Sequence, residues 1–100
     1  MATVDKQNGQ SMKHVCVFST SHGARPGGVF SSRLLAEQWI QFNRLSGMLT
    51  ECPVDIGVYD WAVSTGRVRK LKASSCTPDT VGGFSSHLDH WHYEDGIAVA

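Results

Sequence analysis

The stretch HLDHWHYEDG, near the end of the chain, holds three imidazoles, two aromatic rings and three carboxylates in ten positions. Imidazoles and carboxylates are ligands of zinc and the usual groups of acid–base catalysis. On a helix His87 and His90 would share a face, whereas on a strand His90 and His92 would. We take these three histidines as candidate metal ligands, with Cys76 or Glu94 as further ligands, although no single conformation aligns all three. Zinc is the cofactor that this hypothesis implies; otherwise none is expected.

Two large aromatic residues, Trp91 and Tyr93, alternate with the histidines of this stretch. Tryptophan and tyrosine are enriched at protein contacts, and rings that do not dock on their own domain form an exposed apolar patch. Trp61 follows a predicted strand and opens a predicted helix. We therefore predict that Trp91, Tyr93, His90, His92 and Trp61 contribute to a partner-binding surface. The packing of His90 and His92 around Trp91 as half-buried groups is the structural alternative.

Other residues of types that can take part in catalysis are not spaced as in a recognised catalytic motif. His22 lies in a glycine-rich loop, and Asp55 and Asp60 bracket a predicted strand, so convergence with the tail histidines would be needed for acid–base catalysis. Cys16 or Cys52 would need a partner histidine and a positive environment to act as a nucleophile. The chain has no CxxC or HExxH pattern. No catalytic residue is assigned, and we expect a protein that is not an enzyme.

Size and charge limit the classes of protein that fit. The chain has 100 residues, enough for one domain, and its 41% hydrophobic and 18% charged residues are typical of a globular protein. Nine basic residues balance nine acidic ones, so a nucleic-acid partner is not indicated. The basic run RVRKLK lacks interleaved aromatics and fits a solvated edge. A formal net charge of zero favours self-association, which makes a homodimer a hypothesis.

The expected location is the cytoplasm. Three cysteines, Cys16, Cys52 and Cys76, form an odd and sparse set that suits a reducing compartment. The first thirteen residues have no apolar core of a secretory signal. No apolar run approaches the roughly 20 residues that a membrane-spanning helix needs, so no membrane partner is expected.

The first half of the chain predicts two strands and a helix. Residues 14–20, HVCVFST, alternate as a strand does, and GVFSS at 28–32 fits the return strand of a hairpin across the GARPGG loop. Ser31 or Ser32 would cap a helix over RLLAEQWIQFNRL. Its apolar stripe is expected to consist of Leu35, Trp39 and Phe42, with Ala36 and Ile40 beside them. Gly47 is expected to end this helix in a left-handed cap.

The composition of the second half of the chain predicts an extended segment, a short helix, a linker and a tail. Residues 48–60 favour an extended segment, which Pro53 would confine to an edge or interrupt with a bulge. Asp60 and Gly66 fit the start and the end of a short helix in YDWAVSTG. The predicted domains are a disordered segment at 1–12, an α+β domain at 13–72 that ends in an exposed strand or basic extension, a linker at 73–83 and a tail at 84–100 docked on the domain.

The chain from Val15 onwards resembles a family of small bacterial domains of unknown function. These domains share a pattern of the type GVFSS…AExWI…LSGxLT…PVDxxVYDWA…G and end in HxHYE[DN]G. The chain departs from the pattern at Cys52, where an aromatic residue often precedes the proline, and in its glycine-rich TVGGF. The resemblance implies that the HWHYEDG tail belongs to the domain, and it supplies no catalytic residues. The matching positions are Gly28, Phe30, Ser31, Ala36, Glu37, Trp39, Ile40, Leu45–Gly47, Pro53–Asp55, Tyr59–Ala62, Gly66, His90, His92, Tyr93, Glu94 and Gly96.

Together these patterns predict a small α+β fold in the order β-β-α-β-α with a C-terminal extension. An antiparallel sheet of three to four strands would pack on one main helix. The expected function is a non-enzymatic bacterial module for protein–protein interaction or self-association, for example an immunity or inhibitor protein. A metal-binding domain or metal-dependent enzyme that uses the histidine cluster is the alternative.

Overall fold

The structure is a computed structural model that describes residues 13–23 and 25–99. The segment predicted to be disordered, 1–12, lies outside these residues. In chain order the elements are β2 (His14–Thr20), β3 (Gly28–Phe30), α1 (Arg33–Phe42), β4 (Gly47–Pro53), α2 (Val58–Ser64), the 3₁₀ helix η1 (Ala73–Ser75), α3 (Pro78–Gly82), the 3₁₀ helix η2 (Phe84–His87), β5 (His90–Glu94) and β6 (Ile97–Val99).

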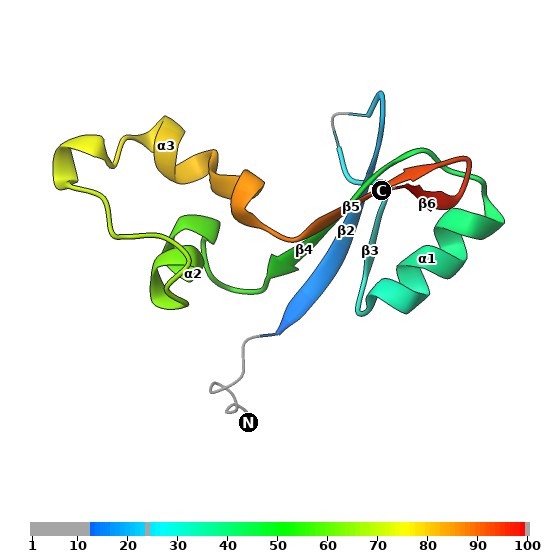
Figure 1. The fold of residues 1–100 in the computed structure, drawn as a ribbon, viewed down its shortest axis with the longest axis horizontal. Coiled ribbons are helices and arrows are strands. Elements are labelled where there is room, and N and C mark those ends of the chain that lie inside the picture. Colours follow the sequence, from blue (N-terminus) through cyan, green and yellow to red (C-terminus); the bar gives the residue numbers. More distant parts are fainter. Residues whose placement is uncertain (1–12, 24, 100) are drawn as a thin grey trace.

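The strands form one antiparallel sheet in the order β3-β2-β4-β5-β6 (Figure 1). This confirms the predicted α+β class with an antiparallel sheet, but the sheet has five strands rather than three or four. The tail supplies the additional strands, because β5 and β6 form a hairpin across Asp95 and Gly96. Both turn residues have positive φ values, 50° and 83°, as a two-residue hairpin turn requires.

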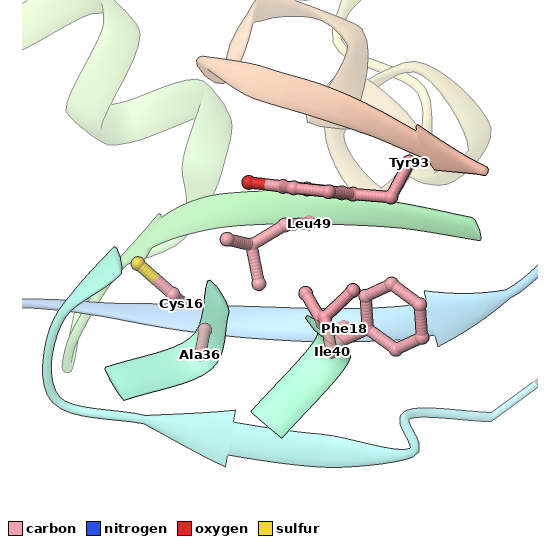
Figure 2. Packing of buried hydrophobic residues seen from close by; sticks show 6 residues of the cluster. All are labelled: Cys16, Phe18, Ala36, Ile40, Leu49 and Tyr93. Carbon is pink, nitrogen blue, oxygen red and sulfur yellow. The ribbon is translucent and has the colours of Figure 1, made fainter. Parts of the chain in front are cut away.

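Helix α1 packs on one face of the sheet through Ala36 and Ile40. Ala36 and Ile40 are fully buried against Phe18 and Leu49, together with Cys16 and Tyr93 (Figure 2). The predicted stripe is therefore wrong at two positions, since Leu35 is 49% exposed and Phe42 is 87% exposed. The methyl group of Ala36 lets the helix approach the sheet closely. Trp39 then packs at the flank, with its ring centroid 5.8 Å from that of Phe18.

The start of α1 matches the prediction and its end does not. Ser32 is the N-cap, and its Oγ accepts a hydrogen bond from the amide of Leu35 at 3.2 Å. The helix ends at Phe42 with Asn43 as its C-cap, and Arg44 takes the left-handed conformation (φ 52°) expected of Gly47. Gly47 instead begins β4, where a Cβ atom would lie 2.2 Å from the carbonyl oxygen of Ser19. This close approach of two strands explains the glycine.

Strand β4 is central, which corrects the prediction of an edge or a bulge at Pro53. Pro53 is the last residue of the strand, whereas β5 pairs with β4 only as far as Thr50. The missing amide hydrogen of Pro53 therefore removes no hydrogen bond between β4 and β5. The chain leaves the extended conformation at once, Asp55 has a φ of 65°, and α2 begins at Val58. Gly66 follows α2 with a φ of 77°, as its predicted place after the helix requires.

A second apolar cluster lies beyond one end of the sheet, on the side away from α1 in Figure 1. Trp61 and Ala62 of α2 are buried there with Leu88, and Cys52 and Phe84 pack against them. The sheet is therefore not packed on one main helix alone. Residues 67–72 are irregular rather than a strand, and the segment predicted as a linker, 73–83, contains η1 and α3.

Candidate functional site

The aromatic and the histidine side chains of strand β5 lie on opposite faces of the sheet. Successive residues of a strand point to opposite sides, so Trp91 and Tyr93 lie on the face that α1 covers. His90, His92 and Glu94 lie on the other face. The ten-residue stretch that looks like one site in the sequence is thus two separate sets of side chains.

The aromatic set belongs to the packed interior. Tyr93 is 3% exposed, and its hydroxyl donates a hydrogen bond of 2.6 Å to Oε2 of Glu37 on α1. Burial, followed by this hydrogen bond, raises the pKa of Tyr93. Trp91 is half-buried, and the guanidinium carbon of Arg33 lies 4.1 Å from the centre of its ring. These contacts hold α1 on the tail and leave Tyr93 almost no surface to offer a partner.

Trp61 is also buried, and it forms one wall of a shallow cleft of about 370 Å³. The guanidinium carbon of Arg67 lies 4.6 Å from the centre of the Trp61 ring, and Nη1 of Arg67 lies 3.6 Å from Oδ1 of Asp89. His14 meets the same ring edge-on at 6.0 Å. Trp61 therefore joins α2 to the start of β2 and to the segment before β5, which is a structural role.

The remaining predicted residues, His90 and His92, lie on a face of the sheet that we call the open face. Helix α1 lies on the opposite face, and several apolar side chains of the open face are exposed: Val29 (61%), Met48 (38%) and Val99 (40%). The strand registers assign to this face Val29 of β3, Val15, Val17 and Ser19 of β2, Met48, Thr50 and Cys52 of β4, His90, His92 and Glu94 of β5, and Ile97 and Val99 of β6.

The structure brings two of the three candidate metal ligands together. The ring centroids of His90 and His92 are 5.2 Å apart, with the rings nearly perpendicular. His87 lies apart from them, stacked on Phe84 at 4.3 Å in η2. Cys76 is in the region of the second cluster, with its sulfur 3.7 Å from the hydroxyl of Tyr59. Across 13–23 and 25–99, no three or more His, Cys, Asp or Glu side chains gather as a metal site would need.

The candidate nucleophiles have environments that disfavour the reactive thiolate. Burial, followed by the nearby charge of Glu51, raises the pKa of both Cys16 and Cys52. A raised pKa keeps a thiol protonated and a poor nucleophile at neutral pH. Among the described residues, no hydrogen bond or ion pair joins His22, Asp55 or Asp60 into a catalytic group.

The open face itself was not found from the sequence, although a signal for it exists. Val15 and Val17 alternate with Cys16 and Phe18, which leaves two apolar faces on one strand, and Met48 follows in β4. A strand that is apolar on both faces is typical of a sheet whose two faces are both covered by other elements or by a partner. Only the register shows that these residues share a face with the histidines.

The fold and this surface define a class of protein: a small α+β domain whose antiparallel sheet is covered by a helix on one face and partly exposed on the other. A family model described as a domain of unknown function (DUF7710) matches residues 15–99, and the chain belongs to this family. Comparison with curated proteins and with solved structures finds no match. No helix in the described part of the chain has the length and apolar character needed to cross a membrane.

Proposed function

We propose that this chain is a non-enzymatic protein-interaction module and that the open face of its sheet is the binding surface. The observation that supports the proposal is the exposure of Val29, Met48 and Val99 on that face, three apolar side chains from an edge strand, a central strand and the other edge strand. Apolar side chains exposed on one face of a sheet favour an interaction role, because apolar patches mark interaction sites on soluble proteins. Half-exposed sheets gain stability when a second layer covers them.

The occupant that we propose is a second copy of the chain. The centre of the open face carries apolar, hydroxyl and imidazole groups, and its one carboxylate, Glu94, lies at the end of β5 beside β6. The whole chain has a formal net charge of zero, so two copies do not repel each other strongly. An uncharged surface is suited to pack on itself about a twofold axis, because each side chain then meets an uncharged neighbour.

The size of the open face indicates a weak dimer. Strands lie about 4.8 Å apart and rise about 3.3 Å per residue, so five strands of three to seven residues present a flat footprint of roughly 400–500 Å². Specific interfaces bury about 800 Å² on each partner, and smaller ones are typically transient. Two sheets packed face to face would lie about 10 Å apart.

Two other functions remain proposals of lower rank. A heterologous partner, as for an immunity or inhibitor protein, would use the same face but would be expected to show a charged surface that complements its target. A metal-dependent enzyme would need more ligands than His90 and His92 provide within one chain. Free thiols at Cys16, Cys52 and Cys76 suit our proposal that the module acts in the cytoplasm.

Sedimentation velocity across a wide range of protein concentrations tests the proposal. We expect the wild-type chain to shift from monomer to dimer as concentration rises, and Met48→Glu to stay monomeric because it places two carboxylates in the interface. Leu34→Glu is the matched control, since Leu34 is exposed on α1 and lies away from the open face. A wild-type monomer at every concentration, or a dimer that Leu34→Glu abolishes and Met48→Glu does not, would contradict the proposal.

A further inference from the structure

We propose that the open face also holds a site for a soft monovalent cation, Cu⁺, formed by His90, His92 and Met48. The site is built within one chain, so it does not depend on a second copy covering the face. Its ligands would be two imidazole nitrogens from β5 and one thioether sulfur from β4.

The two histidines are arranged as a chelating pair. They are separated by one residue on β5, both are exposed, and their ring centroids are 5.2 Å apart. Strand β5 pairs with β4 at both histidines and with β6 from His92 onwards, so its backbone is held in the sheet. A rigid strand therefore presents both rings to the same volume of solvent above the sheet.

A hydrogen bond at Nδ1 of His90 leaves the other ring nitrogen, Nε2, as the metal ligand. Its Nδ1 lies 3.0 Å from the carbonyl oxygen of Leu88. A carbonyl oxygen only accepts, so Nδ1 carries the proton and Nε2 of the neutral ring has a free lone pair. Metal-binding histidines usually donate their second N–H to a carbonyl or carboxylate in this way, which fixes the ring and raises its basicity.

Met48 supplies the ligand that selects the metal. It is the cross-strand partner of His92 and is 38% exposed on the same face. Directly opposite residues in an antiparallel pair have Cβ atoms about 4.5–5.5 Å apart, so the flexible methionine can bring its sulfur to the imidazoles. Thioethers favour Cu⁺ over hard or borderline cations. Thr50, opposite His90, and Val99, opposite His92 on its other side, add no competing carboxylate.

Cys52 lies on the same face but is not assigned as a ligand. Its sulfur is 3.8 Å from the carbonyl oxygen of Thr50, and burial, followed by the charge of Glu51, raises its pKa. A metal-binding cysteine must lose its proton, and both effects oppose that loss. Among the described residues, no third His, Cys, Asp or Glu side chain gathers with the two histidines, whereas zinc sites take three or four such ligands.

The test is anaerobic titration of the reduced full chain with Cu⁺ in competition with a chromophoric Cu⁺ chelator. We expect one Cu⁺ per chain. His90→Ala, His92→Ala and Met48→Leu should each weaken binding by roughly tenfold or more, which corresponds to about 1.4 kcal/mol. Met48→Leu should leave any weak Zn²⁺ binding to the histidine pair unchanged, because leucine keeps the shape and removes only the sulfur.

Two controls make the assignment falsifiable. Cys52→Ser and His22→Ala should retain the wild-type Cu⁺ affinity, and circular dichroism should show that all variants keep the fold. Binding that Cys52→Ser abolishes would overturn the site in favour of a thiolate. No Cu⁺ bound at equimolar protein, or equal affinity in the wild type and Met48→Leu, would likewise overturn the proposal.

Discussion

The two faces of the sheet differ although the same strands build them. One face packs Cys16, Phe18 and Leu49 under α1, where they are almost entirely buried. The other shows Met48 and His92, each the immediate chain neighbour of a buried residue, to solvent. The period of two along each strand separates a surface that packs against α1 from a surface that faces solvent.

This difference teaches how to interpret the histidine-rich tail. Trp91 and Tyr93 were grouped with His90 and His92 because they are close in sequence. In the fold the aromatic residues pack against α1, and the two histidines are exposed on the opposite face. The substitutions below test this division, in order of decreasing expected effect.

The largest effect is expected from Leu49→Ala on the covered face. Leu49 is fully buried, and truncation of such a residue destabilises a protein by about 2–5 kcal/mol. Met48→Ala, one position away on the open face, should change the free energy of unfolding by less than about 1 kcal/mol. Urea denaturation followed by tryptophan fluorescence measures both. Equal losses would remove the distinction between the two faces.

Tyr93→Phe should have the next largest effect, because it removes the hydrogen bond to Glu37. We expect a loss of about 1 kcal/mol, which corresponds to roughly 4–8 °C in the melting temperature of a domain of this size. Glu37→Gln keeps an acceptor and should be less damaging. A melting temperature unchanged by Tyr93→Phe would show that this bond contributes nothing to holding α1.

The same tyrosine gives the stability a dependence on pH. Burial and the bond to Glu37 raise the pKa of Tyr93 in the folded state, so the fold favours the protonated phenol. Its contribution is complete below the unfolded pKa of about 10 and is lost as the pH rises through the folded value. The difference between the wild type and Tyr93→Phe should therefore shrink above about pH 10. A difference that grows with pH would reverse the assigned sign.

Ser32→Ala should weaken the attachment of α1 by removing its N-cap. Caps of this kind contribute about 1 kcal/mol, whereas Ser31→Ala removes no described hydrogen bond of the helix and should be near neutral. Thermal unfolding of the two variants side by side measures the difference. If Ser31→Ala proves the more damaging change, the cap is misassigned.

The smallest effect on stability is expected from the double variant His90→Ala, His92→Ala. Both side chains are exposed, so the change should stay within about 0.5 kcal/mol. The same variant should abolish Cu⁺ binding, which separates a binding role from a packing role. Loss of the fold in this variant would show that the two histidines stabilise the structure and would contradict their assignment as binding residues.

Local patterns predicted the parts of the fold that depend on local interactions. Alternation in HVCVFST defined the first strand, a serine at the right offset predicted the cap of α1, and Gly66 marked the end of α2. The pattern centres the stripe of α1 on Leu35, Trp39 and Phe42 and puts Ala36 and Ile40 beside it, because spacing alone does not show which part of an apolar stripe faces the sheet. The sheet selects the face of the helix that approaches most closely, and this favours a small residue.

The chain itself determined a small α+β domain with an antiparallel sheet, because strand alternation, glycine turns and caps act within a few residues. The tertiary structure alone decided that the tail completes the sheet, that β4 is central and that His90 and His92 share a face with Met48. Those features depend on the register between strands that are distant in the chain, such as the pairing of Met48 with His92. A shift of one residue would move every side chain to the other face.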